Sequence, residues 1–574
     1  MDTISKKIKV IKKKISKIVS LFSKYNIDGY IIPKNDNFFS EYVQHDRLNI
    51  ISKFSGSAGF AVILRNKNYL FVDGRYTLQA EKESGEYFKI IEFPKLLPKD
   101  LFKNINMGFD PSLFTKLQLN YFFGNNLNLR PVNENLIDII KKPKIKKIRP
   151  FYSLPNYATG MSHSRKISLV SNIIKKNNSD YLFISAPENV AWLLNIRGSD
   201  SPFSPIPNCN CLVSKNKEVF LLSNRNKLKK LLKQKKIFNH QIVEPQNLEN
   251  LITKLNGKKI IIDAKTCSIK NEELILKNFS INGREDPCYI LKSKKNSVEI
   301  KNIIKSHIED GVALTKFLYW IKNIKNINLT ELSAEKKLEY FRKKNKNYLY
   351  PSFNTIAGSG PNGAIVHYRA SKNTNRKINK NDIFLCDSGG QYKYGTTDVT
   401  RTICFSKPSN KIKKIFTLVL KGHIAVTISN LKKNNTGKQL DYRARKFLRK
   451  NGYDFKHGTG HGVGYFLNVH EGPQSISKYN NIKLQEGMVL SNEPGFYEKG
   501  KFGIRIENLI FVKKTKNKLN FENLTLAPID KDLIDFKLLN KEEKDYILKY
   551  HLMVYSKLSN FLNTKEKRWF IKNL

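Results

Sequence analysis

The chain has 574 residues, 40% of them hydrophobic and 26% charged, and a formal net charge of +53 at pH 7. One hydrophobic core does not support such a length, so we expect roughly three or four domains. The composition excludes an intrinsically disordered chain. The positive charge raises the possibility of a phosphate-binding face for nucleic acid.

The basic residues are mostly lysines spread from end to end of the chain. Lysine runs such as 142–147 and 229–236 contain no glycine and no aromatic residue. Proteins that bind single-stranded nucleic acids interleave aromatic residues with positive charge. We therefore expect these lysines on solvated surfaces and predict no nucleic-acid partner.

The N-terminal segment has apolar residues at a helical period from Ile4 to Phe22, with lysines between them. A membrane-surface or targeting helix is one interpretation. The segment contains Asp2 but no arginine and no small-residue cleavage site, which favours the first helix of a folded domain. No segment reaches the ~18 apolar residues of a membrane span, so we predict no membrane partner.

The cysteines do not predict disulfides. Six cysteines include no C-x-x-C pair, and a disulfide framework is improbable in so long a chain. Cys386 precedes Asp387 in an apolar segment, which favours a buried thiol. We expect a reducing, cytoplasmic location.

Strands and helices alternate in the first half of the chain in two similar passes. Each pass has a helix, an apolar strand and later a loop with glycine and serine, which predicts two related α/β domains over 1–150 and 151–292. The segments that carry this pattern are the strands 29–33, 61–64 and 69–72 with the loop 54–59, then the helix 162–176, the strand 181–184 and the loop 197–200.

A third domain is predicted over 293–515, after a basic linker around 291–296. It begins with a long amphipathic helix and continues with helices near 330–345, 411–430 and 438–450. The remainder, 516–574, is a C-terminal extension. Its apolar residues have helical spacing from about 525 to the end, and we expect it to dock on the third domain.

Five side chains in this third domain are candidate metal ligands: Asp387, Asp398, His461, Glu493 and Glu507. Four carboxylates and one imidazole form a hard, oxygen-rich set that suits Mn²⁺, Co²⁺ or Zn²⁺ in a bridged pair. Two such ions roughly 3.5 to 4 Å apart would acidify a bridging water to a hydroxide nucleophile. The set predicts a hydrolase.

The segments around these residues indicate how they converge. We expect a strand at 383–387, a turn through 389–391 and a second strand at 395–403 with Asp398 near its middle. Such a hairpin places its two aspartates near each other. In 503–507 the residues alternate, so Arg505 shares a face with Glu507 and supports it. Glu493 precedes a Pro-Gly turn and can also relay a proton.

The histidines fall into two groups. His457 and His461 are four residues apart, but Gly458 stands where the zincin motif needs its glutamate, and the nearby glycines disfavour a helix. We expect a tight turn that presents His461. His367 and His470 are candidate donors to a carbonyl oxygen that gains negative charge during reaction. We predict that they and Glu493 take part in catalysis.

Several segments together resemble the pita-bread metallopeptidases, and within them the long, three-domain aminopeptidases P. The segments, in the order of that family, are DSGGQY (387–392), GTTDVTRT (395–402), HGTGHGVG (457–464), NVHEGP (468–473), NEPGFY (492–497) and GIRIEN (503–508). GSAGFAVI and DGRYTLQA in the first domain, WLLNIRGSD in the second and LTLAPID near the end extend the resemblance over nearly the whole chain.

The resemblance implies a fold and a site. The fold class would be α/β (α+β), with two creatinase-like domains before a pita-bread catalytic domain. The five candidate ligands would bind two Mn²⁺ ions, with Asp398 and Glu507 bridging them. Substrate would contact His367, His457 and His470, and Tyr497 and Arg505 would support the site. Arg75 of the first domain would reach toward the cleft, within its own subunit or across a dimer.

The implied reaction removes an N-terminal residue that precedes proline, so the expected partners are peptides with proline at the second position and a second copy of the chain. A prolidase that acts on Xaa-Pro dipeptides is the nearest alternative, although that family usually lacks the second domain and the C-terminal extension. Methionine aminopeptidases are much shorter. A catalytically dead binding module would have lost ligands, and here all five are present.

Overall fold

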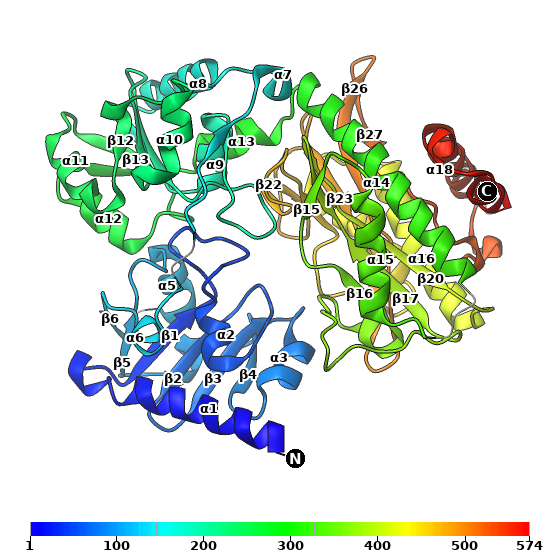
Figure 1. Cartoon of the computed structure of the whole chain (residues 1–574), viewed down its shortest axis with the longest axis horizontal. Helices are drawn as coiled ribbons and strands as arrows, with labels where there is room; N and C mark the ends of the chain where they lie inside the picture. The colour runs from blue at the N-terminus through cyan, green and yellow to red at the C-terminus, as the bar shows by residue number, and fades with distance from the viewer. Residues whose placement is uncertain (1, 125–126, 145–146, 325–327, 573–574) are drawn as a thin grey trace. The chain divides into compact units, whose positions relative to one another are not determined.

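The computed structural model describes residues 2–124, 127–144, 147–324 and 328–572 (Figure 1). The chain divides into two compact units, Met1–Pro155 with Met161–Tyr289 and Asn156–Gly160 with Ile290–Leu574. Within the described ranges, every helix is either too short or too polar to span a bilayer.

The first unit contains two six-stranded sheets with the same topology. The strand orders are β4-β3-β2-β1-β5-β6 and β12-β11-β10-β8-β13-β14. In each sheet the three strands of an antiparallel meander are extended at both ends by parallel strands. The predicted pair of related α/β domains is therefore confirmed.

The first sheet is formed by β1 (Gly29–Pro33), β2 (Phe60–Leu64), β3 (Asn68–Asp73), β4 (Lys89–Phe93), β5 (Asn106–Phe109) and β6 (Asn128–Pro131). Its helices are α1 (Asp2–Val19), α2 (Arg47–Ser52), α3 (Thr77–Ser84), α4 (Pro98–Leu101), α5 (Lys116–Phe123) and α6 (Leu136–Ile140). Ile11 and Ile18 of α1 are fully buried. The first helix thus packs into a folded domain, as its apolar period predicts.

The second sheet is formed by β8 (Tyr181–Ile184), β10 (Asn210–Ser214), β11 (Val219–Leu222), β12 (Ile242–Val243), β13 (Lys259–Ile262) and β14 (Ser280–Gly283), and β7 (Tyr152–Ser153) pairs with β9 (Ile196–Arg197). Its helices are α8 (His163–Lys176), α9 (Pro187–Leu193), α10 (Arg225–Lys233), α11 (Leu248–Lys254), α12 (Ile269–Leu276) and α13 (Pro287–Ser293), which crosses into the second unit. Ser162 caps α8 by accepting a hydrogen bond from the Arg165 backbone N–H, so the helix begins where the sequence predicts.

The second unit carries β15 (Tyr348–Pro351), β16 (Ile356–Ser359), β17 (Ile383–Ser388), β18 (Gly390–Tyr392), β19 (Gly395–Thr396), β20 (Val399–Cys404), β21 (Gly460–Gly462), β22 (Glu471–Ile476), β23 (Val489–Asn492), β24 (Gly495–Glu498), β25 (Phe502–Arg505), β26 (Asn508–Thr515) and β27 (Lys518–Asn523). Its helices are α7 (Asn156–Thr159), α14 (Ser297–Asn323), α15 (Glu331–Lys343), α16 (Asn410–Thr427), α17 (Gly437–Arg449), α18 (Lys541–Leu558) and α19 (Thr564–Lys572).

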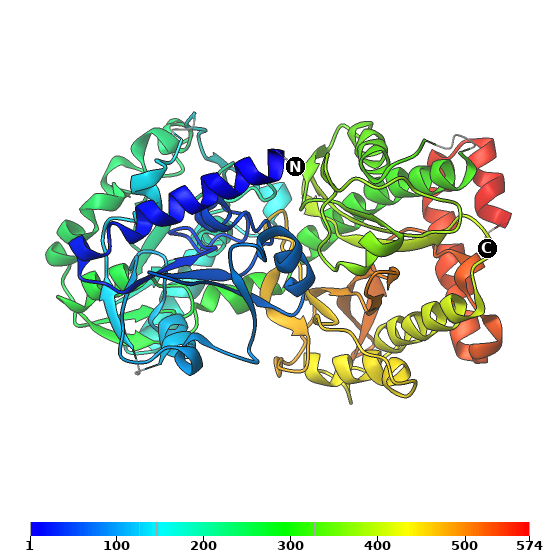
Figure 2. The same ribbon diagram turned by 90° about the horizontal axis from the view of Figure 1, so that it is seen from below.

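In Figure 2 the strands of this unit lie between the green helices α14 and α15 and the yellow helices α16 and α17. Packing agrees with this view. Phe317 of α14 and Leu338 of α15 share one apolar cluster with Phe384 of β17, whereas Phe416 of α16 shares another with Ile504 of β25. Strands enclosed by helices on two sides form the predicted catalytic fold.

The C-terminal residues pack against the rest of the second unit as expected, but their helical segment begins later than the sequence predicts. Residues 525–540 form no α-helix, and the helical pattern becomes α18 and α19. Val554 and Leu558 of α18 and Phe570 of α19 are fully buried in the cluster that includes α16. Their apolar period therefore marks a face against the second unit.

The basic linker is the main departure from expectation. α13 continues through Ser293, and Asn296 caps α14 by accepting hydrogen bonds from the Val298 and Glu299 backbones. Lys292 and Lys295 are buried, although the sequence predicts solvated lysines. Both pair with the buried carboxylate of Glu471, which explains how their charges leave water.

Candidate metal centre

The five predicted ligands lie in strands of the second unit or close to their ends. Asp387 is in β17, Asp398 precedes β20 and His461 is in the middle of β21. Glu493 follows β23, and Glu507 lies between β25 and β26. Strands are rigid elements, so side chains on them or next to their ends have defined directions.

Two local predictions about these segments are wrong. The expected strand 395–403 is broken into β19 and β20, and Asp398 lies in the break. The expected turn 389–391 includes β18, which pairs with β15 and β19 in a separate sheet. β17 does pair with β20, with Ser388 opposite Val399, so the two aspartates still lie at one end of this pair.

The segment around His461 and the segment 503–507 also differ from the prediction. His461 sits in the short strand β21, which pairs with β22 and β23, rather than in a tight turn. The predicted strand 503–507 stops at Arg505, and Glu507 lies outside it. The absence of a helix around His461 is as the glycines predict.

Four of the five candidate ligands bring their atoms close together. Asp398, His461 and Glu507 each offer an atom, and these atoms lie within 4.8 Å of one another. His461 Nε2 is 3.5 Å from Asp398 Oδ2 and 3.4 Å from Glu493 Oε1. The Oδ1 atom of Asp387 is buried and has no hydrogen-bond partner among the described residues. Such an atom is a natural ligand for a cation.

The imidazole of His461 presents the correct nitrogen. Its Nδ1 lies 2.9 Å from the Gly462 carbonyl oxygen, which can only accept, so Nδ1 carries the proton. Nε2, the nitrogen left for a metal ion, therefore faces Asp398 and Glu493. A histidine ligand whose other nitrogen donates to a backbone carbonyl is held in one tautomer and orientation.

The electrostatics of the cluster fit a bound cation. Burial raises the pKa of Asp398 to about 6 and that of Glu507 well above its ordinary value, and the neighbouring carboxylates add to both shifts. Burial alone would lower the pKa of His461, but Asp398 and Glu493 raise it to about 9. The contributions of the neighbouring carboxylates to these shifts show an excess of negative charge that a divalent cation would neutralise.

Arg505 holds two of the carboxylates in place. Its Nη2 donates to Asp387 Oδ2 at 2.6 Å, and its Nε donates to the Thr400 hydroxyl at 3.1 Å. The same hydroxyl donates to Glu507 Oε2 at 2.8 Å. Sequence reasoning missed Thr400, although the expected strand 395–403 would place it at the next alternate position after Asp398 and therefore on the same side.

Ser491 is a second missed residue. Its hydroxyl donates to Glu493 Oε1 at 3.0 Å and accepts from the His461 backbone N–H at 2.9 Å. It therefore fixes these two side chains relative to each other. In the sequence, Ser491 stands two residues before Glu493. In an extended segment this spacing places both side chains on the same side, and it could have indicated the contact.

Tyr497 and His457 form a polar chain beside the carboxylates. Arg505 Nη1 donates to the Tyr497 hydroxyl at 2.6 Å, and that hydroxyl lies 2.9 Å from His457 Nε2. His457 Nδ1 lies 2.7 Å from the Gly458 carbonyl, so Nε2 accepts from the tyrosine. These hydrogen bonds fix the ring of His457.

The two remaining predicted histidines occupy different settings. The His470 ring lies edge-on to the His461 ring, with 4.2 Å between centroids, and His470 is exposed. His367 is half-buried in the turn after the short 3₁₀ helix η4 (Gly360–Ala364). η4 packs on β25 so closely that a Cβ at Gly503 would lie 1.8 Å from the Gly363 carbonyl oxygen. Glycine is required there.

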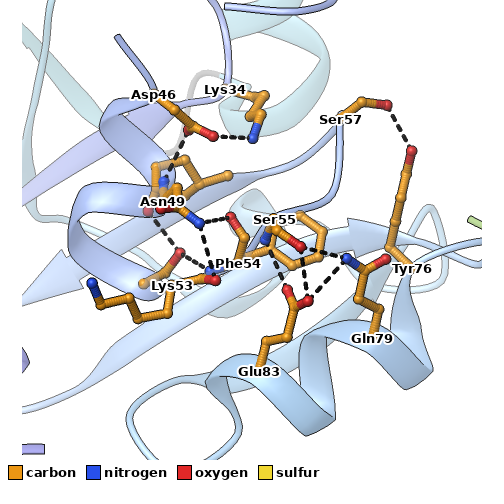
Figure 3. A network of polar contacts seen from close by, with 12 residues as sticks. Lys34, Asp46, Asn49, Lys53, Phe54, Ser55, Ser57, Tyr76, Gln79 and Glu83 are labelled. Carbon is orange, nitrogen blue, oxygen red and sulfur yellow. Dashed lines mark hydrogen bonds and ion pairs between the residues drawn. The ribbon is translucent and has the colours of Figure 1, made fainter. Parts of the chain in front are cut away.

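Arg75 belongs to the first unit. Its guanidinium pairs with Asp73 through Nε at 2.9 Å and Nη2 at 2.7 Å. The neighbouring Tyr76 hydroxyl lies 2.6 Å from Ser57 Oγ, which ties the DGRY and GSAG segments together (Figure 3). The predicted role of Arg75 in substrate binding stays a prediction.

Figure 3 also shows how the GSAG loop is held from its other side. Glu83 of α3 accepts from both the backbone N–H and the hydroxyl of Ser55, each at 2.8 Å. Gln79 Nε2 donates to the same hydroxyl at 2.8 Å. The two N-terminal segments of the family resemblance therefore form one structural unit.

A second acidic group, Cys404 with Asp530 and Asp532, also brings potential ligand atoms within 4.8 Å. The ammonium of Lys322 already lies 2.8 Å from Asp530 and 3.0 Å from Asp532. It also donates to the Cys404 carbonyl at 2.8 Å. The ammonium of Lys322 thus compensates the negative charge of this group, and no metal ion is needed to do so.

Glu471 is a further residue that the sequence did not single out. It follows His470, and its carboxylate lies 2.8 Å from Lys295 Nζ and 3.3 Å from Lys292 Nζ, all at 1% side-chain exposure or less. Burial would raise the pKa of Glu471, but the two ammonium groups lower it below its ordinary value. The three charges hold the segment after His470 against the start of α14.

We expect Glu471→Gln to lower the free energy of unfolding by about 3 kcal/mol, because it leaves buried ammonium groups without their carboxylate. Urea denaturation at pH 7 measures it. Because the folded pKa is lowered, this stabilisation is present above the unfolded pKa and disappears as the pH falls through the folded pKa. Glu285→Gln is the control, since its pair with Lys265 is exposed; equal losses in the two variants would contradict the prediction.

Comparisons with known proteins agree with this geometry. Residues 301–514 match the metallopeptidase family M24, and residues 517–574 match the C-terminal region of that peptidase family. Residues 14–134 and 141–299 each match a creatinase/prolidase N-terminal domain. These matches follow the chain from the first sheet to the last helix.

Full-length relatives extend the similarity. The chain is 35% identical to a probable Xaa-Pro aminopeptidase P of Laccaria bicolor, over 97% of this chain and 92% of that protein. A probable Xaa-Pro aminopeptidase P of Paracoccidioides brasiliensis is also 35% identical, over 96% and 97% of the two chains. The chain belongs to the aminopeptidase P family.

A solved structure shows the same fold over the same length. The X-prolyl aminopeptidase of Caenorhabditis elegans, described as a cytosolic enzyme with a di-nuclear active site, superposes with a TM-score of 0.90 at 30% identity. The match covers 98% of this aminopeptidase P family member and 99% of that chain. The predicted fold class is therefore confirmed.

A prolidase of Pyrococcus horikoshii shares only part of the fold. It superposes with a TM-score of 0.52 at 27% identity and covers 64% of this chain. The aminopeptidase P family member is thus substantially longer than this prolidase. It is a metallopeptidase by family and by the chemistry of its clustered carboxylates.

Proposed function

We propose that this enzyme is an aminopeptidase that hydrolyses the bond between the first residue of a peptide and a proline at the second position. Two divalent ions, Mn²⁺ with Co²⁺ or Zn²⁺ as alternatives, would be held by Asp387, Asp398, His461, Glu493 and Glu507. The proposal rests on the convergence of three carboxylates, those of Asp398, Glu493 and Glu507, on His461. The buried Oδ1 of Asp387, which has no partner among the described residues, adds a fourth candidate ligand atom.

The bound ions would supply Lewis acidity and an activated water. Arg505 keeps Asp387 in position, and Ser491 orients Glu493. Glu493 is suited to take a proton from the attacking water and return it to the nitrogen of the leaving proline. His470 lies beside His461 and, with His367, would donate to the carbonyl oxygen as negative charge develops on it.

Proline at the second position explains why a specialised enzyme is needed. The nitrogen of the scissile bond carries no hydrogen. A site that binds its substrate through a hydrogen bond from that N–H therefore cannot bind a peptide with proline at this position. Selection must rest on the shape of the pyrrolidine ring. His457, fixed by Tyr497, would line this pocket.

Three further parts of the proposal concern the whole molecule. The chain would divide into domains at 1–150, 151–292, 293–515 and 516–574. Two copies would form a homodimer, and Arg75 would then contact substrate of its own or the partner subunit. The location would be cytoplasmic.

The test compares a tripeptide Xaa-Pro-Xaa with the dipeptide Xaa-Pro, using purified full-length enzyme with Mn²⁺. We expect release of the first residue from the tripeptide with kcat/KM at least about tenfold above that for the dipeptide, because the residue after proline adds contacts to the transition state. A peptide with alanine in place of proline is the control. Cleavage of the dipeptide alone would assign a prolidase, and cleavage of neither would refute the proposal.

A further inference from the structure

Arg401 has an uncommon environment for a charged side chain. It lies in β20, shortly after Asp398, and is 1% exposed. Among the described residues, its hydrogen-bond acceptors are all neutral: the carbonyls of Thr400, Glu507, Ala527 and Pro528, the side-chain amide of Asn508 and the hydroxyl of Tyr550. A buried cation is costly unless its donors are satisfied, and here every nitrogen has an acceptor.

One side of this guanidinium holds the backbone of a candidate ligand. Arg401 Nη1 donates to the Glu507 carbonyl at 2.6 Å, and Nη2 donates to Asn508 Oδ1 at 2.8 Å. The Glu507 backbone N–H in turn donates to the Thr400 carbonyl at 3.2 Å. The backbone of Glu507 is therefore fixed to β20 from both its N–H and its carbonyl.

The other side of the guanidinium contacts the C-terminal region. Its Nε donates to the Pro528 carbonyl at 3.0 Å, and its Nη2 donates to the Ala527 carbonyl at 2.8 Å and the Tyr550 hydroxyl at 2.9 Å. Tyr550 lies on α18 and is 3% exposed. Its hydroxyl also lies 2.9 Å from the Ala527 carbonyl and 3.1 Å from the Thr525 carbonyl, to one of which its single hydrogen donates.

We infer that Arg401 and Tyr550 are positioning residues of the metal centre, through which the C-terminal region sets the place of Glu507 relative to Asp398. The inference rests on the proposed role of Glu507 as a ligand. A carboxylate that is to bind a metal ion must be placed to within about 0.5 Å, and altering the residues that hold such ligands commonly changes metal affinity. Residues 516–574 are then part of the metal site and not an appendage.

Tyr550→Phe tests this with the smallest change, because it deletes one hydroxyl and keeps the ring in its apolar cluster. Tyr555→Phe is the matched control, on the same helix and packed on Phe570 with 5.5 Å between ring centroids. Metal-free full-length protein is titrated with Mn²⁺ by isothermal calorimetry. We expect affinity to fall about tenfold in Tyr550→Phe and to stay within about twofold in Tyr555→Phe.

Activity and stability measurements separate positioning from simple packing. At saturating Mn²⁺ we expect Tyr550→Phe to recover most of the wild-type kcat with an unchanged KM, since the ions themselves restore the ligand geometry. Arg401→Lys keeps the charge but cannot reach three segments, so its Mn²⁺ affinity should fall further. Because calorimetry needs no substrate, a failure of the proposed activity would leave this result interpretable.

Two results would overturn the inference. One is unchanged Mn²⁺ affinity in both Tyr550→Phe and Arg401→Lys, with only the thermal unfolding temperature lowered, which would assign both residues to the core. The other is an equal loss of affinity in Tyr550→Phe and Tyr555→Phe, which would trace the effect to a general loosening of α18.

Discussion

Asp398→Asn is expected to lower kcat/KM for an Xaa-Pro-Xaa peptide by on the order of 1,000-fold. The substitution keeps the size of the side chain but removes the charge that faces His461 Nε2 at 3.5 Å. Catalysis by bound metal is worth several kcal/mol, and each ~1.4 kcal/mol corresponds to a factor of ten in rate. Initial rates over a range of Mn²⁺ concentrations measure the effect.

Asp532→Asn is the matched control for that experiment. Asp532 belongs to the other acidic group, where Lys322 already meets the charge, and its side chain is 53% exposed. We expect its activity within about twofold of wild type. Full activity in Asp398→Asn, or an equal loss in both variants, would contradict the assignment of Asp398 to the metal centre.

Arg505→Lys is expected to lower kcat/KM by about 100-fold, although it preserves the charge. The guanidinium donates in three directions, to Asp387, Tyr497 and Thr400. A lysine ammonium is a compact charge and cannot reproduce this planar fork. Asp387 and Tyr497 would both lose their fixed positions, so kcat should change more than KM.

The control for Arg505 is Arg449→Lys, whose guanidinium pairs with Asp454 at 45% side-chain exposure. That variant should retain wild-type kinetics, because exposed pairs contribute little. If Arg505→Lys is also fully active, the fork to Asp387 and Tyr497 is not needed, and the carboxylates are positioned by their strands alone.

Several features of the site could be predicted because they depend on residues close in sequence. Alternation in 503–507 indicates that Arg505 and Glu507 point to one side, and in the structure both contact the Thr400 hydroxyl. Gly458 in place of a glutamate excludes a zincin helix, and the structure has no helix there. These predictions agree with the structure because they depend only on the period of a strand or on the conformational preference of glycine.

Other local predictions failed where neighbouring residues pair with strands of two different sheets. The segment 395–403 has strand character throughout, yet it is divided because β19 pairs with β18 while β20 pairs with β17. The break at Asp398 is a consequence of this change of partner. Strand propensity reports how well a residue fits a sheet, not which sheet receives it.

The sequence by itself determined the two repeated α/β domains, the family and the identity of the candidate ligands, since periodicity and short motifs are properties of neighbouring residues. Only the tertiary structure decided which charges are buried and what they meet. Lys295 pairs with Glu471, 176 positions away, and Arg401 reaches Tyr550 across 149 positions. A lysine is identical in the sequence whether it is solvated or buried, because its environment is created by distant segments that pack against it.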